Sequence, residues 1–397
     1  MKFFVKTFGC RLNSLDSARL SAALLQAQHI PTTLAQADLV IFNSCLVTQT
    51  AEQKLKRAVR QALAKHKKVQ ILGCAARLHA AALKQTFPQV AIFATEEAWR
   101  QNFGLKPAFN LPPQFRTRLP IMVSTGCDNH CTFCVTRLAR GDFRSLSEKM
   151  IFAQIAQATK LDLKEIVLTG VNLGAFGARN SREFQTTQLP ELLTKILHKT
   201  PLPRIRLSSL GPEFLQPQFW QVFQNPRLCD FLHLAVQAGS NKILRLMGRP
   251  YSVAQIQKVA EHARQVRPNV ALGADLIVGF PGESLANFAQ TKKLVTELGF
   301  AKLHVFPFSP HPETPAAQLP QQIPLAEKLR RARELRALGQ VLRQKFIATQ
   351  LGKKQAVLVE KNGFGWTTNY LPVRIKNGLP NVIYEICLTQ ENLGEKD

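Results

Sequence analysis

The amino-terminal segment, residues 1–106, repeats one pattern three times: a short β-rich apolar run, a turn that contains a cysteine, and a helical stretch. The apolar runs cover residues 3–7, 39–42 and 69–72. Because strands that alternate with helices form parallel sheets, this segment predicts a parallel α/β domain. The cysteines that follow the three runs would lie at the carboxyl edge of the sheet, where open α/β sheets bind ligands.

A second α/β pattern follows a proline-rich stretch, which predicts a linker over residues 107–118. The expected strands cover residues 119–124, 165–169, 204–208, 231–236, 271–278 and 302–306. The expected helices include residues 147–160, 190–199, 252–266 and 285–298. Six β/α units without a seventh and an eighth predict a partial (β/α)6 barrel over residues 119–348.

The carboxy-terminal part of the chain changes pattern again. Residues 324–350 form a strongly basic helical pattern, and short strand patterns follow at 355–360, 370–375 and 382–388. The tripeptide Gly363-Phe364-Gly365 is typical of a turn. Residues 349–397 therefore predict a small β domain, which at this size needs to dock on the rest of the chain. The predicted class is α/β throughout the first two domains.

Composition narrows the class of partner. A chain of 397 residues with 45% hydrophobic residues predicts two or three folded domains and excludes a disordered protein. The net charge of +26 favours a polyanion as partner, although charge alone does not distinguish it from a merely soluble surface. We prefer nucleic acid to a membrane, because the longest apolar run, residues 270–280, is far shorter than the ~20 residues of a spanning helix. Residues 1–6 do not resemble a signal peptide, so we expect a cytoplasmic location.

Eight cysteines in a reducing compartment point to metal or redox chemistry before disulfides. Cys127, Cys131 and Cys134 recur at steps of four and three on a loop after an expected strand. A structural zinc needs four ligands, and His130 is badly placed to be the fourth. In a cubane iron–sulfur cluster, three cysteines leave one iron open for a ligand that is not protein. We therefore favour a cluster over zinc for this loop.

Cys10, Cys45 and Cys74 form a second set of three. Each follows a small residue, which lets the backbone approach a bulky cofactor closely. The alternative is three unrelated buried cysteines, but their common position after successive strands favours a shared site. Cys229 and Cys387 have no such context, and we assign both to core packing.

These residues carry a resemblance to a known family. Cys127, Cys131 and Cys134, with Phe133 before the last cysteine, resemble the signature of the radical S-adenosylmethionine (SAM) superfamily. With the amino-terminal cysteines, the tail and residues 10–13, 43–48 and 137–141, the whole chain resembles the methylthiotransferases. Residues 168–174, 273–281 and 304–310 look most similar to the branch that acts on N6-threonylcarbamoyladenosine in tRNA.

The resemblance implies a transferase with SAM and two [4Fe–4S] clusters, each held by three cysteines with one open iron. In the family, reductive cleavage of SAM at the Cys127–Cys131–Cys134 cluster yields a radical that abstracts hydrogen from C2 of adenine. The cluster on Cys10, Cys45 and Cys74 would supply the sulfur, so that C–H becomes C–S–CH3. The resemblance also implies a radical SAM barrel, a TRAM-like RNA-binding tail and the anticodon stem-loop of tRNA as partner. The sequence does not identify the reductant protein or the sulfur donor.

Further site residues are expected from their positions. Polar or aromatic residues near the cluster loop and after barrel strands are candidates for SAM contacts, with ordinary strand-end residues as the alternative. These candidates are Phe133, Asn172, Ser209 and Gln237. Cationic and aromatic residues are candidates for RNA contacts, with solvated helix faces and core packing as the alternatives. These are Arg140, Arg331, Trp366, Tyr370 and Arg374, together with basic runs at 53–68 and 330–345.

Two rival functions stay open on the sequence. A methylthiotransferase could act on isopentenyl-adenosine in tRNA or on a ribosomal protein instead. From a different class, the chain could be a non-catalytic iron–sulfur or zinc regulator that binds RNA. Two departures from the family bear on substrate contacts: the tail is short, and residues 311–314 replace the basic and glycine residues common at that point.

Overall fold

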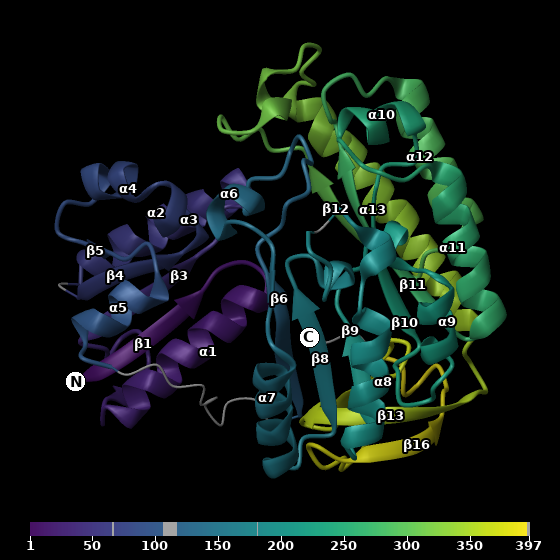
Figure 1. Cartoon of the computed structure of the whole chain (residues 1–397), viewed down its shortest axis with the longest axis horizontal. Helices are drawn as coiled ribbons and strands as arrows, with labels where there is room; N and C mark the ends of the chain where they lie inside the picture. The colour runs from purple at the N-terminus through teal and green to yellow at the C-terminus, as the bar shows by residue number, and fades with distance from the viewer. Residues whose placement is uncertain (66, 106–116, 181, 395–397) are drawn as a thin grey trace. The chain divides into compact units, whose positions relative to one another are not determined.

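The computed structural model describes residues 1–65, 67–105, 117–180 and 182–394. The chain divides into two compact units (Figure 1). Unit 1 comprises residues 1–115 and 134–142, and unit 2 comprises residues 116–133 and 143–397. Most of the predicted linker, residues 107–116, and the last three residues of the tail lie outside the described residues. The domain boundaries drawn from the sequence therefore stay predictions.

Unit 1 is built on a five-stranded parallel sheet, as the repeated strand–helix pattern predicts. The strand order is β2-β1-β3-β4-β5. The strands are β1 (Lys2–Thr7), β2 (Ile30–Pro31), β3 (Leu39–Ser44), β4 (Lys68–Gly73) and β5 (Ala91–Ile92). The helices are α1 (Arg11–Gln26), α2 (Gln49–Leu63), α3 (Cys74–Leu78), α4 (Ala80–Thr86), α5 (Glu96–Asn102) and, from the later segment, α6 (Thr136–Arg140). The sequence pattern did not predict the two-residue edge strands β2 and β5.

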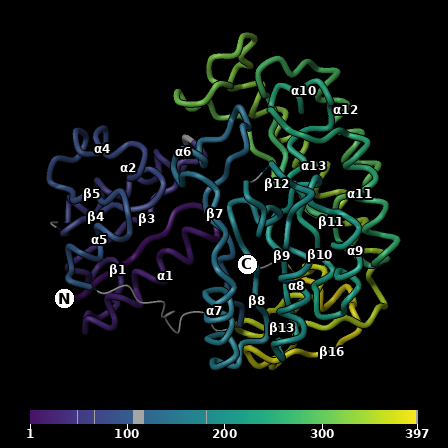
Figure 2. The backbone as a smooth tube through the Cα atoms, in the orientation of Figure 1, coloured from purple at the N-terminus to yellow at the C-terminus, as the bar shows by residue number. Residues whose placement is uncertain are grey.

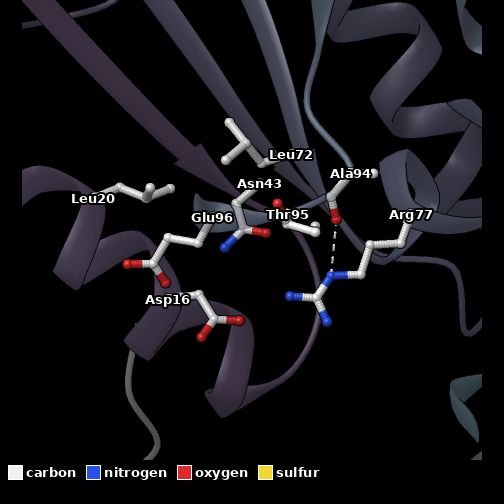
Figure 3. Close-up of a pocket in the computed structure, with 9 residues that line it drawn as sticks. Asp16, Leu20, Asn43, Leu72, Arg77, Ala94, Thr95 and Glu96 are labelled. Carbon is white, nitrogen blue, oxygen red and sulfur yellow. Dashed lines mark hydrogen bonds between the residues drawn. The ribbon is translucent and has the colours of Figure 1, made fainter. Parts of the chain in front are cut away.

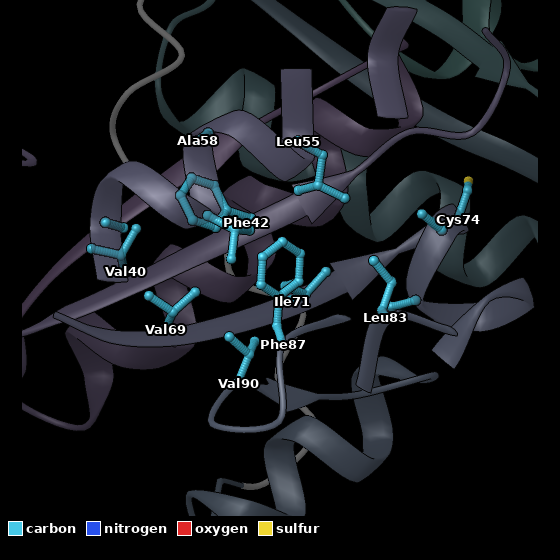
Figure 4. Packing of buried hydrophobic residues seen from close by; sticks show 14 of the residues in the cluster. Val40, Phe42, Leu55, Ala58, Val69, Ile71, Cys74, Leu83, Phe87 and Val90 are labelled. Atoms are coloured by element: carbon cyan, nitrogen blue, oxygen red, sulfur yellow. The ribbon is translucent and has the colours of Figure 1, made fainter. Parts of the chain in front are cut away.

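Helices cover both faces of this sheet. On one face, Phe42 and Ile71 pack against Leu55 and Val59 of α2 and against the turn that ends α4 (Figure 4). The opposite face packs against α1 and α5, with Trp99 fully buried. Every residue of β3 is buried, which explains its continuous apolar run. The sheet is therefore held rigidly from both sides, and its carboxyl edge is a fixed platform.

Unit 2 contains six parallel barrel strands: β6 (Arg118–Thr125), β8 (Glu165–Gly170), β9 (Arg204–Leu207), β10 (Phe231–Gln237), β11 (Ala271–Val278) and β12 (Lys302–Pro307). They form two sheets, β7-β6-β8-β9 and β10-β11-β12, where β7 (Arg144–Ser145) is a short antiparallel addition. Figure 2 shows β9 beside β10, where the two sheets meet. A parallel bridge from Leu210 to Leu234 links them. The predicted partial (β/α)6 barrel is thus confirmed, and each predicted strand agrees with an observed one within two residues at either end.

The helices of unit 2 are α7 (Glu148–Lys160), α8 (Leu189–Lys199), α9 (Pro217–Phe223), α10 (Asn241–Leu246), α11 (Val253–Val266), α12 (Leu285–Glu297) and α13 (Leu325–Ala348). Capping boxes at Ser252 with Gln255 and at Ser284 with Asn287 begin α11 and α12. No helix in the described part of the chain is both long and apolar enough to cross a membrane.

The tail is a four-stranded antiparallel sheet in the order β15-β14-β13-β16. Its strands are β13 (Lys354–Lys361), β14 (Phe364–Thr367), β15 (Pro372–Arg374) and β16 (Ile383–Cys387). The prediction of a turn at Gly363-Phe364-Gly365 was wrong for two of its residues, because Phe364 and Gly365 begin β14. The turn is Asn362-Gly363, where Gly363 has a φ of +70° and a Cβ would lie 2.3 Å from the carbonyl oxygen of Ile375.

The tail docks on the amino-terminal ends of the barrel strands. Arg204 and Arg206 of β9 donate hydrogen bonds of 3.0–3.2 Å to the backbone carbonyls of Trp366, Thr367 and Thr368. The ring of Tyr370 stacks on that of Phe231 with centroids 5.0 Å apart. These contacts supply the docking that a β domain of this size needs.

Candidate functional site

The cysteines of unit 1 meet at the carboxyl edge of its sheet. Cys10 precedes α1, Cys45 follows β3, and Cys74 begins α3 directly after β4. The Sγ atoms of Cys10 and Cys74 lie 3.8 and 3.9 Å from the same atom, Asn13 Oδ1. A Cβ on Gly9 would lie 2.7 Å from Cys45 Sγ. Parallel register brings these residues together across sequence separations of 35 and 29 residues.

Asn13 organises this thiol group. Its Nδ2 donates to the carbonyls of Phe8 and Ser44, both at 2.9 Å, and thereby ties the loops that carry Cys10 and Cys45. Its Oδ1 accepts from Arg140 Nη2 at 2.6 Å. The sequence singled out Asn13 only as part of a motif; its place in the first turn of α1, three residues after Cys10, was the available signal for this role.

Cys45 and Cys74 are buried and Cys10 is exposed, and a buried cation lies beside this thiol group. Burial raises the pKa of the Cys45 thiol, and it raises that of Cys74 despite the opposing effect of Arg140. Burial alone would lower the pKa of Arg140, but Asp16, whose Oδ2 lies 3.0 Å from Nη2, and the cysteines raise it, so the guanidinium stays charged. A permanent positive charge therefore lies near Cys10 and Cys74, which bind metal as thiolates.

The donor set of these thiols fits a cubane cluster better than zinc. A structural zinc site is closed by four ligands, whereas this sheet edge brings together three cysteines. Three thiolates hold three corners of a cubane and leave one iron open. The residues present would therefore suit an iron–sulfur cluster with one open iron.

A small recess of about 20 Å³ opens at the same sheet edge (Figure 3). Asp16, Asn43, Arg77 and Glu96 are among its polar lining residues. Among the residues described by the structure, Asn43 Oδ1 has no hydrogen-bond partner although it is buried. The recess has room for about one water molecule, which would satisfy this oxygen.

The second set of cysteines lies on the loop between β6 and α6. Within unit 2, Arg249 Nη1 lies 3.1 Å from Cys131 Sγ, and Arg249 is itself held by Tyr251 and Glu213. Thr132 donates its backbone N–H to Met247 and its hydroxyl to Leu246, so the loop is fastened to the end of α10. Cys134 begins the segment that belongs to unit 1. The grouping of Cys134 with Cys127 and Cys131 therefore rests on their spacing along one loop.

Comparisons with known proteins agree with this arrangement. The family model described as "Radical SAM superfamily" matches residues 121–295, and "Uncharacterized protein family UPF0004" matches residues 2–95. A relative from Thermotoga maritima named "Threonylcarbamoyladenosine tRNA methylthiotransferase MtaB" is 33% identical, over 90% of this chain and 86% of the relative. The chain belongs to the radical SAM methylthiotransferases. Its predicted family, enzyme class and cofactors, SAM and [4Fe–4S] clusters, are thereby confirmed.

Other relatives of this methylthiotransferase carry a different substrate name. A protein from Verminephrobacter eiseniae named "tRNA-2-methylthio-N(6)-dimethylallyladenosine synthase" is 30% identical, over 90% of this chain and 86% of the relative. Among solved structures, the radical SAM methyltransferase TsrM from Kitasatospora setae aligns with a TM-score of 0.58 at 13% identity, over 80% of this chain and 77% of that one. That structural similarity confirms the fold of the methylthiotransferase.

The residues expected to contact SAM lie where barrel strands end. Asn172 follows β8, and its buried Nδ2 has no partner among the residues that the structure describes. Ser209 follows β9, and its hydroxyl donates to Asp275 at 3.1 Å. Gln237 ends β10 with a φ of +64°, and the ring of Phe133 packs edge-on against Phe280. The unpartnered amide of Asn172 fits a polar ligand at the barrel mouth, and the four SAM contacts stay predictions.

The residues expected to contact RNA have mixed surroundings. Arg140 is buried against Asp16, and Arg331 is buried in ion pairs with Glu283 and Glu327. Both placements favour a structural role over a phosphate contact. Tyr370 packs on the barrel, and Trp366 Nε1 donates to Glu360 at 3.0 Å, whereas Arg374 is exposed. RNA binding by these five residues stays a prediction, which Arg374 fits best.

Substituting Gly9 tests the site in unit 1. We expect Gly9→Ala to reduce iron loading from two clusters to one, because the new Cβ would collide with Cys45 and because Gly9 has a φ of +104°. Gly104→Ala is the matched control, since Gly104 also has a positive φ, of +62°, but nothing lies within 4 Å of its Cβ position. Iron and sulfide should be measured after anaerobic reconstitution of both variants. Equal loading of the two variants would contradict this role of Gly9.

Proposed function

We propose that this methylthiotransferase converts N6-threonylcarbamoyladenosine next to the anticodon of tRNA to its 2-methylthio derivative. The observation that carries the reaction class is the convergence of Cys10, Cys45 and Cys74 in addition to a separate cysteine loop in the barrel unit. Relatives named for threonylcarbamoyladenosine support this substrate. The similarity of residues 168–174, 273–281 and 304–310 to that branch of the family supports it as well. Relatives named for dimethylallyladenosine support the alternative.

The bound clusters and SAM would supply the radical and sulfur chemistry, and the chain supplies binding and orientation. In unit 1, Asn13 fixes the loops that carry two of the thiols, and Arg140 holds Asn13. In unit 2, Arg249 sets the position of Cys131. Asn172, Ser209 and Gln237 would orient SAM at the carboxyl ends of the strands, where β/α barrels build their sites.

The charge of the protein supports an RNA substrate, and exposed cations on α2 offer a surface for phosphate contacts. On α2, Lys54, Arg57 and Arg60 are exposed. On α13, Arg330 forms ion pairs with Glu327 and Glu334, so part of its charge is neutralised within the helix. An anticodon stem-loop would be attracted chiefly by cations that lack such partners. The choice of the anticodon stem-loop as the RNA segment is part of this proposal and does not follow from the family alone.

Analysis of tRNA nucleosides tests the proposal directly. We expect cells that lack the protein to lose the 2-methylthio form of threonylcarbamoyladenosine and to accumulate its precursor. Mass spectrometry of digested tRNA, with complementation by the intact gene and by a Cys131→Ala variant, measures this. Loss of 2-methylthio-isopentenyladenosine instead would transfer the function to the other branch, and an unchanged nucleoside profile would exclude a tRNA substrate.

A further inference from the structure

Three polar side chains on neighbouring barrel strands form a cluster that the reaction chemistry described above does not use. His233 of β10, Asp275 of β11 and His304 of β12 bring one ligand atom each within 4.8 Å of the others. Asp275 Oδ1 lies 2.8 Å from His233 Nε2 and 3.2 Å from His304 Nδ1, and Oδ2 accepts from Ser209. Gly273 leaves room for the cluster, because a Cβ there would lie 2.5 Å from His233 Nδ1.

The hydrogen bonds fix which ring nitrogens carry protons. Burial alone would raise the pKa of Asp275, but hydrogen bonds from His233 and His304 hold it well below its usual range. A carboxylate can only accept hydrogen bonds, so His233 Nε2 and His304 Nδ1 must both be N–H donors. The remaining nitrogen of His304, Nε2, has no hydrogen-bond partner in the described part of the chain.

His304 presents that nitrogen to the inner side of the barrel. Side chains alternate along a strand, and Leu303 of β12 faces α13, where it lies against Gly339. Lys302, His304 and Phe306 therefore share the opposite face, toward Asp275 and His233. The His304 side chain is 44% exposed there, so a ligand can reach it.

We propose that His304, held by Asp275 and His233, hydrogen-bonds the polar N6 substituent of the target adenosine and so determines substrate specificity. This inference rests on the proposed function. A threonylcarbamoyl group carries a ureido group, a hydroxyl and a carboxylate, whereas an isopentenyl group is a hydrocarbon. A hydrocarbon would displace water from His304 and offer no hydrogen bond in return. The inner face of the barrel therefore favours the polar substituent.

A bound metal ion is the competing explanation of two histidines and a carboxylate. The hydrogen-bond geometry favours an organic ligand, because the Asp275 carboxylate already has three hydrogen-bond partners, Ser209, His233 and His304, and needs no ion to satisfy it. The three groups satisfy one another, whereas metal ligands need free lone pairs directed at one point. An organic ligand at the outward nitrogen of His304 leaves this arrangement intact.

The test compares two anticodon stem-loop RNAs that differ only in the N6 substituent, threonylcarbamoyl or isopentenyl. The full reconstituted chain is assayed as wild type, His304→Leu and His304→Gln, with His198→Leu on the exposed side of α8 as the matched control. Both kcat/KM for methylthiolation and the Kd for each RNA are measured. Binding is a readout that does not depend on turnover, and circular dichroism with iron content reports on folding.

We expect wild type to prefer the threonylcarbamoyl RNA and His304→Leu to lower its kcat/KM on that RNA about 100-fold, with weaker binding. The kcat/KM of His304→Leu on the isopentenyl RNA should stay close to that of wild type or rise. His304→Gln should keep part of the preference for the threonylcarbamoyl RNA, and His198→Leu should match wild type on both RNAs. Equal losses on both RNAs, or one equivalent of metal that His304→Leu removes, would overturn the assignment while leaving the methylthiotransferase function in place. Wild type that methylthiolates neither RNA would overturn the proposed function itself, and this inference with it.

Discussion

Replacing Cys131 with alanine is expected to abolish cleavage of SAM, whereas replacing Cys45 is expected to spare cleavage and abolish methylthiolation. Cys131 lies on the loop of the barrel unit and is approached by Arg249, while Cys45 lies at the sheet edge of unit 1 with Cys10 and Cys74. Since each triad has only three thiols, loss of one leaves two ligands for its cluster. Because the triads belong to different structural elements, the two losses should be separable.

The measurement is the yield of 5′-deoxyadenosine and of methylthiolated RNA from each reconstituted variant. Cys387→Ala is the matched control, because Cys387 lies at the end of β16 outside both triads. Its assignment to core packing from the sequence was wrong, since the residue is exposed on the small sheet of the tail, whereas Cys229 is buried as expected. It should keep both activities and the full iron content. Methylthiolation by either triad variant at the wild-type rate would refute the assignment of two separate centres.

Replacing Glu165 with glutamine is expected to destabilise unit 2 by about 3–5 kcal/mol, the cost typical of removing one partner from a buried ion pair. Glu165 is fully buried and lies 2.9 Å from both Arg204 and Arg206, with Arg118 at 3.9 Å. The same arginines hold the tail through backbone carbonyls, so the loss should also loosen β14. Glu148→Gln is the matched control, because Glu148 forms an exposed pair with Lys195 and should cost under about 1 kcal/mol.

The pH dependence of stability gives this prediction a second readout. Burial alone would raise the pKa of Glu165, but Arg206, Arg204 and Arg118 lower it to about 2. A carboxyl group with a depressed folded-state pKa stabilises the protein fully above its unfolded value, ~4.3, and loses that contribution as the pH falls through about 2. The difference in unfolding free energy between wild type and Glu165→Gln, from urea titrations, should therefore shrink over this range. A difference that is independent of pH would show that the Glu165 charge does not stabilise the fold.

The periodic parts of the fold could be predicted from the sequence because their signals are local. The apolar pattern located the barrel strands to within two residues at either end, and it located α11 and α12 to within one residue. Cysteines after strands could be grouped because parallel strands end at one edge. Two-residue strands and β14 were missed, since such short segments carry too little pattern to distinguish a strand from a turn.

The roles of single charged and aromatic residues could not be predicted in the same way. In the sequence, Arg331 belongs to a basic run. In the structure it is buried and forms ion pairs with Glu283, 48 residues earlier in the chain, and with Glu327, four residues earlier. The sequence predicts that Tyr370 stacks on RNA bases, whereas in the structure its ring packs on that of Phe231. A guanidinium or an aromatic ring has the same sequence signal whether its partner is a protein group or a nucleic acid. Only the contacts decide.

The sequence by itself determined the α/β class, the two cysteine triads and the resemblance to the methylthiotransferases, because each depends on spacing within short segments. The tertiary structure decided the roles of residues that act across long separations: Asn13 between the thiols of unit 1, Glu165 among three arginines, and His304 beside Asp275 and His233. Strand register sets these pairings, and register is fixed by the packing of whole sheets and helices. That packing is a collective property, which no local pattern of residues carries.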